Sequence, residues 1–239
     1  MRVAVVSDIH GNLPALEAVA AHLRADCFDV VVNLGDSVSG PLFPRETAQF
    51  LMAEDWIHLA GNHERQLLEL GENSVPSDIY AHSQLDAVHM DWIATLPHTR
   101  PLDGGISLCH GTPSSDVTPL LENGDQLASR EQITARLGDT EASLVLCGHS
   151  HVPRSVRIDG RLIVNPGSVG LPAYDDDRPF PHVIQTGSPD ARYAVVDFRS
   201  GAWTVSLISV PYAVERAAAA AEMHGRSDWA VGLRTGFMA

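Results

Sequence analysis

Basic side chains are scarce in this chain. Its 239 residues include 16 lysines and arginines against 30 aspartates and glutamates, so the formal net charge is -14 at pH 7. Affinity for long nucleic acids comes largely from Lys and Arg at the phosphates, and the charge balance therefore argues against such a partner. If the substrate is nevertheless anionic, something other than the overall protein charge must attract it.

Long apolar runs and paired cysteines are missing as well. No stretch of about 18 apolar residues occurs that could span a bilayer, and the N-terminus enters a strand-like run without a basic region and cleavage site. The three cysteines, Cys27, Cys109 and Cys147, are too few and too scattered for a disulfide framework. We therefore expect a cytoplasmic protein without membrane contact; the sequence predicts no oligomeric state.

Nothing in the sequence marks a boundary between two domains. The chain has no internal repeat and no low-complexity linker. Its apolar content of 44% is enough for one large core. We therefore expect residues 1–239 to form a single domain.

Strand-like and helix-like segments alternate in the first part of the chain. The expected strands are 2–7, 29–34, 56–60, 105–109 and 143–147, and the expected helices are 12–25, 44–53, 64–71, 79–95 and 126–137. This alternation is typical of α/β proteins.

The pattern changes after His151 to short strands that follow one another directly. They are expected at 153–158, 161–165, 193–198 and 202–209, with DG and RSG as tight-turn signals within each pair. Such hairpins indicate mixed sheets. The Ala-rich segment 211–224 and the last residues predict two closing helices.

Residues 170–191 fit neither pattern, because they contain four prolines and three consecutive acidic residues. This composition predicts a solvated surface loop. The alternative is a lid over a site or a loop that contacts a partner.

Polar residues of one chemical kind directly follow each of the five α/β strands. In chain order they are Asp8 and His10, then Asp36, then Asn62 and His63, then His110, then His149 and His151. Ligands bind at the carboxyl ends of strands in α/β sheets, so these residues should converge. Neighbouring glycines at 35, 61, 111 and 148 indicate close backbone approach there.

Asp8 and His10 have two interpretations, a shared metal site or an ordinary turn. Side chains two positions apart in an extended segment project to the same side, so Asp8 and His10 could hold one ion together. Otherwise Asp8 begins a turn and His10 is an ordinary polar residue. The recurrence of such endings after every strand favours the ion.

The ordered series D-x-H, G-D, G-N-H-E, H-G and G-H-x-H resembles the calcineurin-like metallophosphoesterases, from residue 3 to about residue 170. HGTP at 110–113 and NPGSVG at 165–170 are similar to the small bacterial phosphodiesterases of that superfamily. The resemblance implies an α/β fold, a single-domain metallophosphoesterase-type β-sandwich of two mixed sheets flanked by helices. This chain departs from the pattern at Glu64, where Asp is usual, and in a longer segment 172–191.

The resemblance also implies two divalent metal ions per chain. One would be held by Asp8, His10, Asp36 and His151, and the other by Asp36, Asn62, His110 and His149, with Asp36 as the bridge. Carboxylate, imidazole and amide oxygen suit first-row divalent ions, and the absence of thiolates argues against a structural zinc site. We expect manganese first, with iron, zinc, nickel or cobalt as alternatives.

Two such ions bring four positive charges and the two carboxylates remove two, which leaves about +2 at the site. An acidic protein can therefore bind an anionic phosphate there. By this resemblance, two ions about 3.5 to 4 Å apart would supply a bridging hydroxide from water as the nucleophile for phosphorus. In this scheme His63 protonates the departing oxygen as general acid and Glu64 orients His63.

The predicted function is hydrolysis of a small phosphate ester, most simply a phosphodiester. Phosphomonoesters and phosphoproteins stay open as substrates, because all three reactions use the same metal ligands. The non-enzymatic alternative is a metal-bound regulatory or scaffold protein. This alternative is disfavoured because every motif position for a metal ligand, and the position of the general acid, carries a suitable residue. The seven other histidines, among them His58, His82 and His182, have no predicted role.

Overall fold

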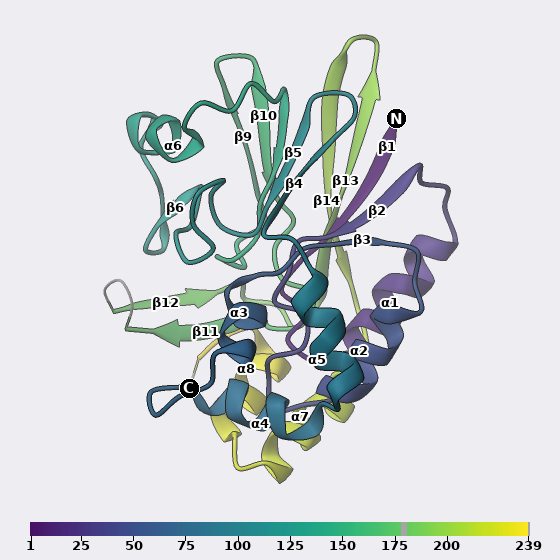
Figure 1. Ribbon diagram of the computed structural model, residues 1–239, viewed down its shortest axis with the longest axis vertical. Helices are drawn as coiled ribbons and strands as arrows, with labels where there is room; N and C mark the ends of the chain where they lie inside the picture. Colours follow the sequence, from purple (N-terminus) through teal and green to yellow (C-terminus); the bar gives the residue numbers. More distant parts are fainter. Residues whose placement is uncertain (178–180, 239) are drawn as a thin grey trace.

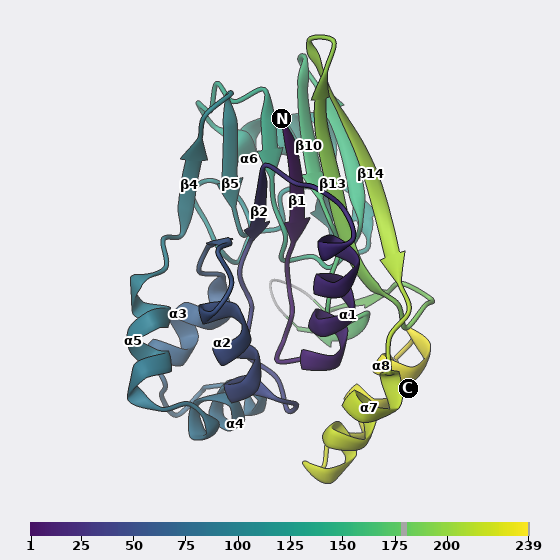
Figure 2. The ribbon, with the colours of Figure 1, turned by 90° about the vertical axis from the view of Figure 1, so that its right-hand side faces the viewer.

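Two five-stranded mixed sheets pack face to face (Figures 1 and 2). The computed structural model of the chain describes residues 1–177 and 181–238. The first sheet has the order β14-β13-β1-β2-β3. Its parallel strands are β1 (Arg2–Val6), β2 (Val30–Asn33) and β3 (Ile57–His58), and its antiparallel strands are β13 (Ala191–Arg199) and β14 (Ala202–Val210).

The second sheet, in the order β4-β5-β8-β10-β9, has a similar plan. Its parallel centre is β5 (Ile106–Cys109), β8 (Leu144–Leu146) and β10 (Arg161–Asn165), and its antiparallel edges are β4 (Thr99–Leu102) and β9 (Arg154–Ile158). The prediction of an α/β fold with two mixed sheets is confirmed, and so are both hairpins after His151. The edge strand β4 was not predicted; it contains Pro101, which an edge position tolerates.

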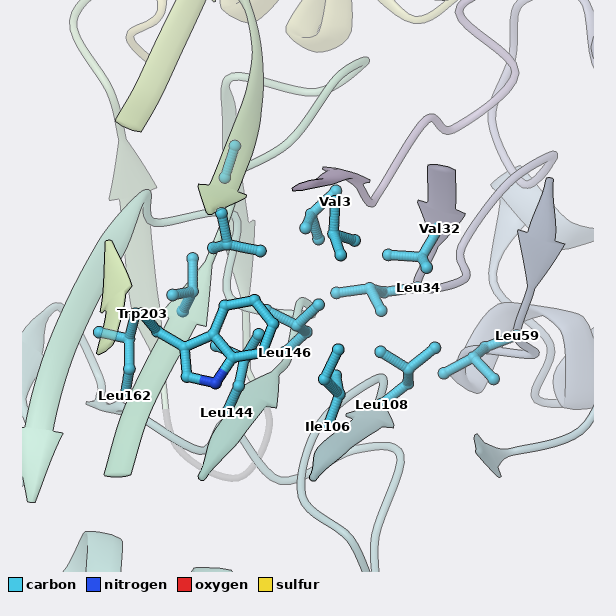
Figure 3. Close-up of a cluster of buried hydrophobic side chains, with 14 residues drawn as sticks. Val3, Val32, Leu34, Leu59, Ile106, Leu108, Leu144, Leu146, Leu162 and Trp203 are labelled. Carbon is cyan, nitrogen blue, oxygen red and sulfur yellow. The ribbon is translucent and has the colours of Figure 1, made fainter. Parts of the chain in front are cut away.

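The main core lies between the two sheets (Figure 3). Val3, Val32 and Leu34 of the first sheet face Ile106, Leu108, Leu144, Leu146 and Leu162 of the second, with Trp203 closing one side. The intervening residues Ala4 and Val6 point to the other face of the first sheet, which α1 (Leu13–Arg24) covers. Because both faces of β1 are buried, its sequence is a continuous apolar run and does not alternate between apolar and polar residues.

The remaining helices flank the sheets. α6 (Arg130–Leu137) covers the outer face of the second sheet through Ile133 and Leu137. The others lie beyond one end of the sandwich (Figure 2): α2 (Pro44–Met52), α3 (Asn62–Leu68), α4 (Pro76–Gln84), α5 (Ala87–Thr95), α7 (Val214–Met223) and α8 (Ser227–Thr235). None of the helices in the described part of the chain is long and apolar enough to cross a membrane.

The single helix predicted at 79–95 is wrong, because α4 and α5 are separate helices. Leu85 and Asp86 between them have extended backbone, with ψ of 140° and 168°. The backbone N–H of Asp86 donates to His89 Nδ1 at 3.1 Å, which starts the second helix independently. The helix predicted at 126–137 begins later, at Arg130, because Gln126–Leu127 (β7) pairs with Glu122–Asn123 (β6).

The prediction of a surface loop at 170–191 is also wrong for the described residues of this range. Ala173–Asp176 (β11) and His182–Gln185 (β12) form an antiparallel hairpin, which Figure 1 shows below the second sheet. The ring of Tyr174 packs against His151 with centroids 4.7 Å apart. This ordered hairpin therefore reaches the ends of the strands where the polar residues gather; positions 178–180 lie outside the described residues.

Replacing a core leucine between the sheets should destabilise the protein strongly. Leu108 is fully buried, so Leu108→Ala removes apolar contacts and leaves a cavity. We expect a loss of about 2 to 5 kcal/mol in the free energy of unfolding, measured by urea denaturation. The control Leu207→Ala, at an exposed position of β14, should cost less than about 1 kcal/mol. Equal losses for the two variants would contradict the assignment of the core.

Candidate metal centre

The predicted ligands lie just beyond the carboxyl ends of strands from both sheets. Seven non-glycine residues of the described chain have positive φ, and five of them are predicted ligands: Asp8 (56°), His10 (52°), Asp36 (53°), His149 (71°) and His151 (59°). This conformation is unfavourable for such residues and is concentrated at functional sites. The tight turns direct the side chains back toward one common space.

Backbone contacts hold these turns close to each other. The N–H of Asp8 donates to the Gly35 carbonyl and the N–H of His10 to the Asp36 carbonyl, both at 3.0 Å. A Cβ on Gly148 would lie 2.0 Å from Ser7 Oγ, and one on Gly61 would lie 2.2 Å from Asp36 Oδ1. The close approach predicted for these two glycines is confirmed.

Two groups of three side chains have the geometry of metal sites. The first is Asp8, His10 and His151, and the second is Asp36, His110 and His149; within each group the ligand atoms lie within 4.8 Å of one another. His110 Nε2 is 3.9 Å from Asp8 Oδ1, so the two groups adjoin. All the residues predicted to bind metal come together, because Asn62 Oδ1 also lies 3.2 Å from His110 Nε2.

The hydrogen bonds of three imidazoles suit metal binding. Each directs Nδ1 at a backbone carbonyl: His10 at Ser39 (2.9 Å), His110 at Leu34 (3.0 Å) and His151 at Leu171 (2.8 Å). A carbonyl only accepts, so Nδ1 carries the hydrogen, and Nε2 of a neutral ring then presents its lone pair. Carbonyls in this role fix the tautomer and the orientation of metal-binding histidines.

His10 Nε2 and His151 Nε2 face each other 3.1 Å apart, so two lone pairs meet there when both rings are neutral. Beside them, Asp8 Oδ1 is buried and has no hydrogen-bond partner, with His151 Nε2 at 3.4 Å. Buried acceptors that face one another without a donor are unfavourable. A divalent cation among them would satisfy all three, so these residues fit the metal that the sequence predicts.

The pKa values of the histidine ligands shift in opposite directions. Burial lowers the pKa of His10 to about 3. Burial and the charge of His110 lower the pKa of His149 to about 4. Burial also disfavours the charged form of His110, but the charge of Asp36 at 3.0 Å raises its pKa to about 10. Without metal, His110 therefore holds a proton against Asp36 at neutral pH.

His63 lies beside the ligands but is not oriented as predicted. Its Nδ1 donates to Asp78 Oδ1 at 2.8 Å, and Asp78 is itself buried in α4. Burial lowers the pKa of His63, but the charge of Asp36 and the hydrogen bond to Asp78 raise it to about 9. The contact expected from Glu64 is therefore made by Asp78, which no sequence pattern singled out.

Glu64 occupies a different place. Its carboxylate accepts hydrogen bonds from the backbone N–H groups of Asp36 (2.7 Å), Ser37 (2.8 Å) and Gly61 (2.8 Å). These bonds join the turn after β2 to the start of α3. The prediction that Glu64 orients His63 is corrected accordingly, because a carboxylate saturated by backbone donors in this turn holds Asp36 and Asn62 in place instead.

The two groups open on a cavity of about 330 Å³. His10, Asp36, Asn62, His63, His149 and His151 form its floor. Its walls include Val75 before α4, Tyr174 of β11 and Trp229 of α8. Sequence analysis missed these wall residues because they come from segments remote from the strand ends. A small molecule in the cavity would touch the metal groups and His63 together.

The two face-to-face sheets and the paired groups at their strand ends define a metallophosphoesterase-type protein. A family model for the calcineurin-like phosphoesterase superfamily domain matches residues 1–197, and the chain belongs to this superfamily. The resemblance seen in the sequence is thereby confirmed.

Two solved structures share the fold over nearly the whole chain, and one curated relative matches most of its sequence. A metallophosphoesterase from Sphaerobacter thermophilus is 26% identical with a TM-score of 0.77, covering 99% of each chain. A hypothetical protein from Pyrococcus horikoshii is 19% identical, also with a TM-score of 0.77, covering 100% of this chain and 99% of its own. An uncharacterised protein of Methanocaldococcus jannaschii is 22% identical, covering 90% of this chain and 89% of its own.

Metal binding at pH 7 should release protons. His110 has a pKa of about 10 in the metal-free protein, and a metal ligand must be neutral, so about one proton per chain should leave His110. Metal affinity should therefore rise with pH. Isothermal titration with manganese in two buffers of different ionisation enthalpy measures the release. Identical apparent enthalpies in both buffers would contradict a protonated His110.

Proposed function

We propose that the protein hydrolyses small phosphate esters, phosphodiesters in particular, with two divalent metal ions held by Asp8, His10, Asp36, Asn62, His110, His149 and His151. The observation that carries the proposal is the pair of Nε2 atoms of His10 and His151, 3.1 Å apart beside the buried Asp8 carboxylate. The second group adjoins it, and residues of both groups line the cavity. Asp36 is proposed as the bridging ligand.

When bound, a pair of divalent ions supplies a nucleophile from water at neutral pH and neutralises charge on the phosphate oxygens. The chain's own contribution is to hold the ligands rigidly. The Nδ1 bonds of the histidines to backbone carbonyls fix three rings, and Glu64 fixes the turn that carries Asp36. Asn62 adds an oxygen ligand without charge, which preserves the positive surplus that attracts an anionic ester.

His63 is proposed as the general acid for the leaving group. Its Nδ1 is committed to Asp78, so Nε2 is the atom left to face the substrate in the cavity. With a pKa raised to about 9, the imidazole is protonated at neutral pH and can give Nε2–H to the departing alkoxide. Asp78 is a positioning residue in this scheme, since it holds the ring and stabilises its charge.

The size of the cavity and two sequence motifs favour a small phosphodiester as the substrate. A cavity of about 330 Å³ has the volume of a small-molecule site, which favours a small ester over a phosphoprotein. The HGTP and NPGSVG stretches are similar to the phosphodiesterase branch, which favours diesters over monoesters. Complete ligand and acid positions favour an enzyme over a regulatory or scaffold protein. Manganese is proposed as the metal because of the mixed nitrogen and oxygen ligands.

Removal of metal should abolish hydrolysis. Dialysis against a chelator should eliminate turnover of bis(4-nitrophenyl) phosphate, and manganese should restore it better than magnesium, which prefers oxygen ligands in octahedral geometry. Activity and metal content by elemental analysis are measured on the same preparation. Full activity in a metal-free preparation would sink the proposed function.

The role of His63 depends on the leaving group. His63→Ala should reduce kcat by about 10²- to 10⁴-fold for a poor leaving group such as an alkoxide, because general acid catalysis contributes on that scale. A nitrophenolate leaving group needs little protonation, so the loss of kcat for a nitrophenyl ester should be far smaller. The metal content of the variant should stay unchanged. Asp78→Asn should give the same leaving-group dependence with a smaller loss and should shift the basic limb of the pH profile.

The matched control is His82→Ala, an exposed histidine on α4 that does not line the cavity, which should leave both esters unaffected. Equal losses on the two esters in His63→Ala would instead indicate that His63 binds or positions the phosphate. A loss of metal would mean that His63 is a ligand.

A further inference from the structure

The cavity wall beyond the metal groups is acidic. Among its described lining residues, leaving out the proposed ligands, Arg226 is the one lysine or arginine, whereas Asp175, Asp176 and Asp228 are acidic. Asp175 lies exposed on β11, and Asp228 lies in the first turn of α8. Beyond the metal groups and His63, Arg226 is therefore the one guanidinium of the described lining that can extend the positive surplus along this wall.

The charge of Arg226 is already paired. Its Nε and Nη2 atoms donate to the Asp228 carboxylate at 2.9 and 2.6 Å. Its guanidinium also stacks over the ring of Trp229, 5.4 Å from the centroid. A planar cation held in this way by a bidentate carboxylate is not available to a second phosphate of a substrate.

Apolar surface occupies much of the remaining wall. Val75 and Val117 are 44% and 47% exposed, although they line the cavity, and Trp229 extends the apolar wall up to His10, with ring centroids 6.1 Å apart. Exposed valines in a concave site are favourable when a ligand covers them. The apolar wall thus begins directly at the first metal group.

We propose that this wall selects substrates in which a single phosphate is joined to an uncharged apolar or aromatic group, and that it disfavours substrates with further anionic charge, nucleoside polyphosphates included. The proposal rests on the proposed function, since it places the phosphate at the metal groups. The organic group lies against Val75, Val117 and Trp229, while Asp175 repels a second anion and Arg226, paired with Asp228, does not attract one.

Three phosphonates that share one head group test the wall by binding alone. Methylphosphonate, phenylphosphonate and 4-carboxyphenylphosphonate are titrated calorimetrically into the manganese-loaded protein. The phenyl compound should bind about tenfold more tightly than the methyl compound, because its ring buries apolar surface. The distal carboxylate should weaken binding about fivefold through repulsion by the acidic wall.

Variants of the wall separate the two contributions. Asp228→Asn frees Arg226 and should tighten binding of the carboxyphenyl compound about fivefold, with methylphosphonate unchanged; Asp175→Asn should act in the same direction and guards against misfolding of the first variant. Val117→Ser should weaken the phenyl compound about threefold and leave the methyl compound unchanged. Glu17→Gln is the control, because it removes one exposed charge outside the cavity and should change nothing.

The inference is overturned if the carboxyphenyl compound binds as tightly as the phenyl compound to the wild-type protein. It is also overturned if both aspartate variants leave that ratio unchanged. Hydrolysis of bis(4-nitrophenyl) phosphate is measured on the same preparation. Hydrolysis without discrimination among the phosphonates rejects the substrate class alone, whereas absence of hydrolysis rejects the proposed function and the substrate class together.

Discussion

The crowding of buried carboxylates and imidazoles at one end of the sandwich is the constraint on which the rest of the structure depends. Asp8, Asp36 and His110 are almost completely buried within a few ångströms of one another, and the Nε2 atoms of His10 and His151 face each other 3.1 Å apart. Such a cluster is costly without a cation and is held together only by a rigid surrounding. The packed core between the sheets provides that rigidity.

Both sheets supply residues to the same site from the carboxyl ends of their strands. In the first sheet β1 is followed by Asp8 and His10, β2 by Asp36 and β3 by Asn62. In the second sheet β5 is followed by His110, and β8 by His149 and His151. Contacts between the turns, such as the backbone N–H of His149 to Asp8 Oδ2 at 3.2 Å, join the two sets. A shift of one sheet relative to the other would separate the ligands, so the core and the site are one mechanical unit.

The part of the chain that follows the last proposed ligand, His151, contributes residues to the wall of the cavity. The hairpin β11–β12 and helix α8 add Tyr174, Arg226 and Trp229 to the wall of the cavity. The superfamily match ends at residue 197, so α8 lies beyond it. In the proposed reaction the metal ligands must be fixed at the strand ends, whereas the organic part of the substrate would lie against the outer wall.

The sequence by itself determined the parallel strands, the hairpins after His151 and the residues gathered at the strand ends, because apolar runs that end in Asp, Asn or His leave a local signal. Only the tertiary structure decided that Asp78 contacts His63, that Glu64 holds a turn, and that residues 170–191 contain a hairpin. It also divided the helix predicted at 79–95, where the apolar spacing continues through an extended Leu85. The contacts involved join residues that are distant along the chain, such as Asp78 of α4 and His63 at the start of α3, and no local pattern of residues encodes them.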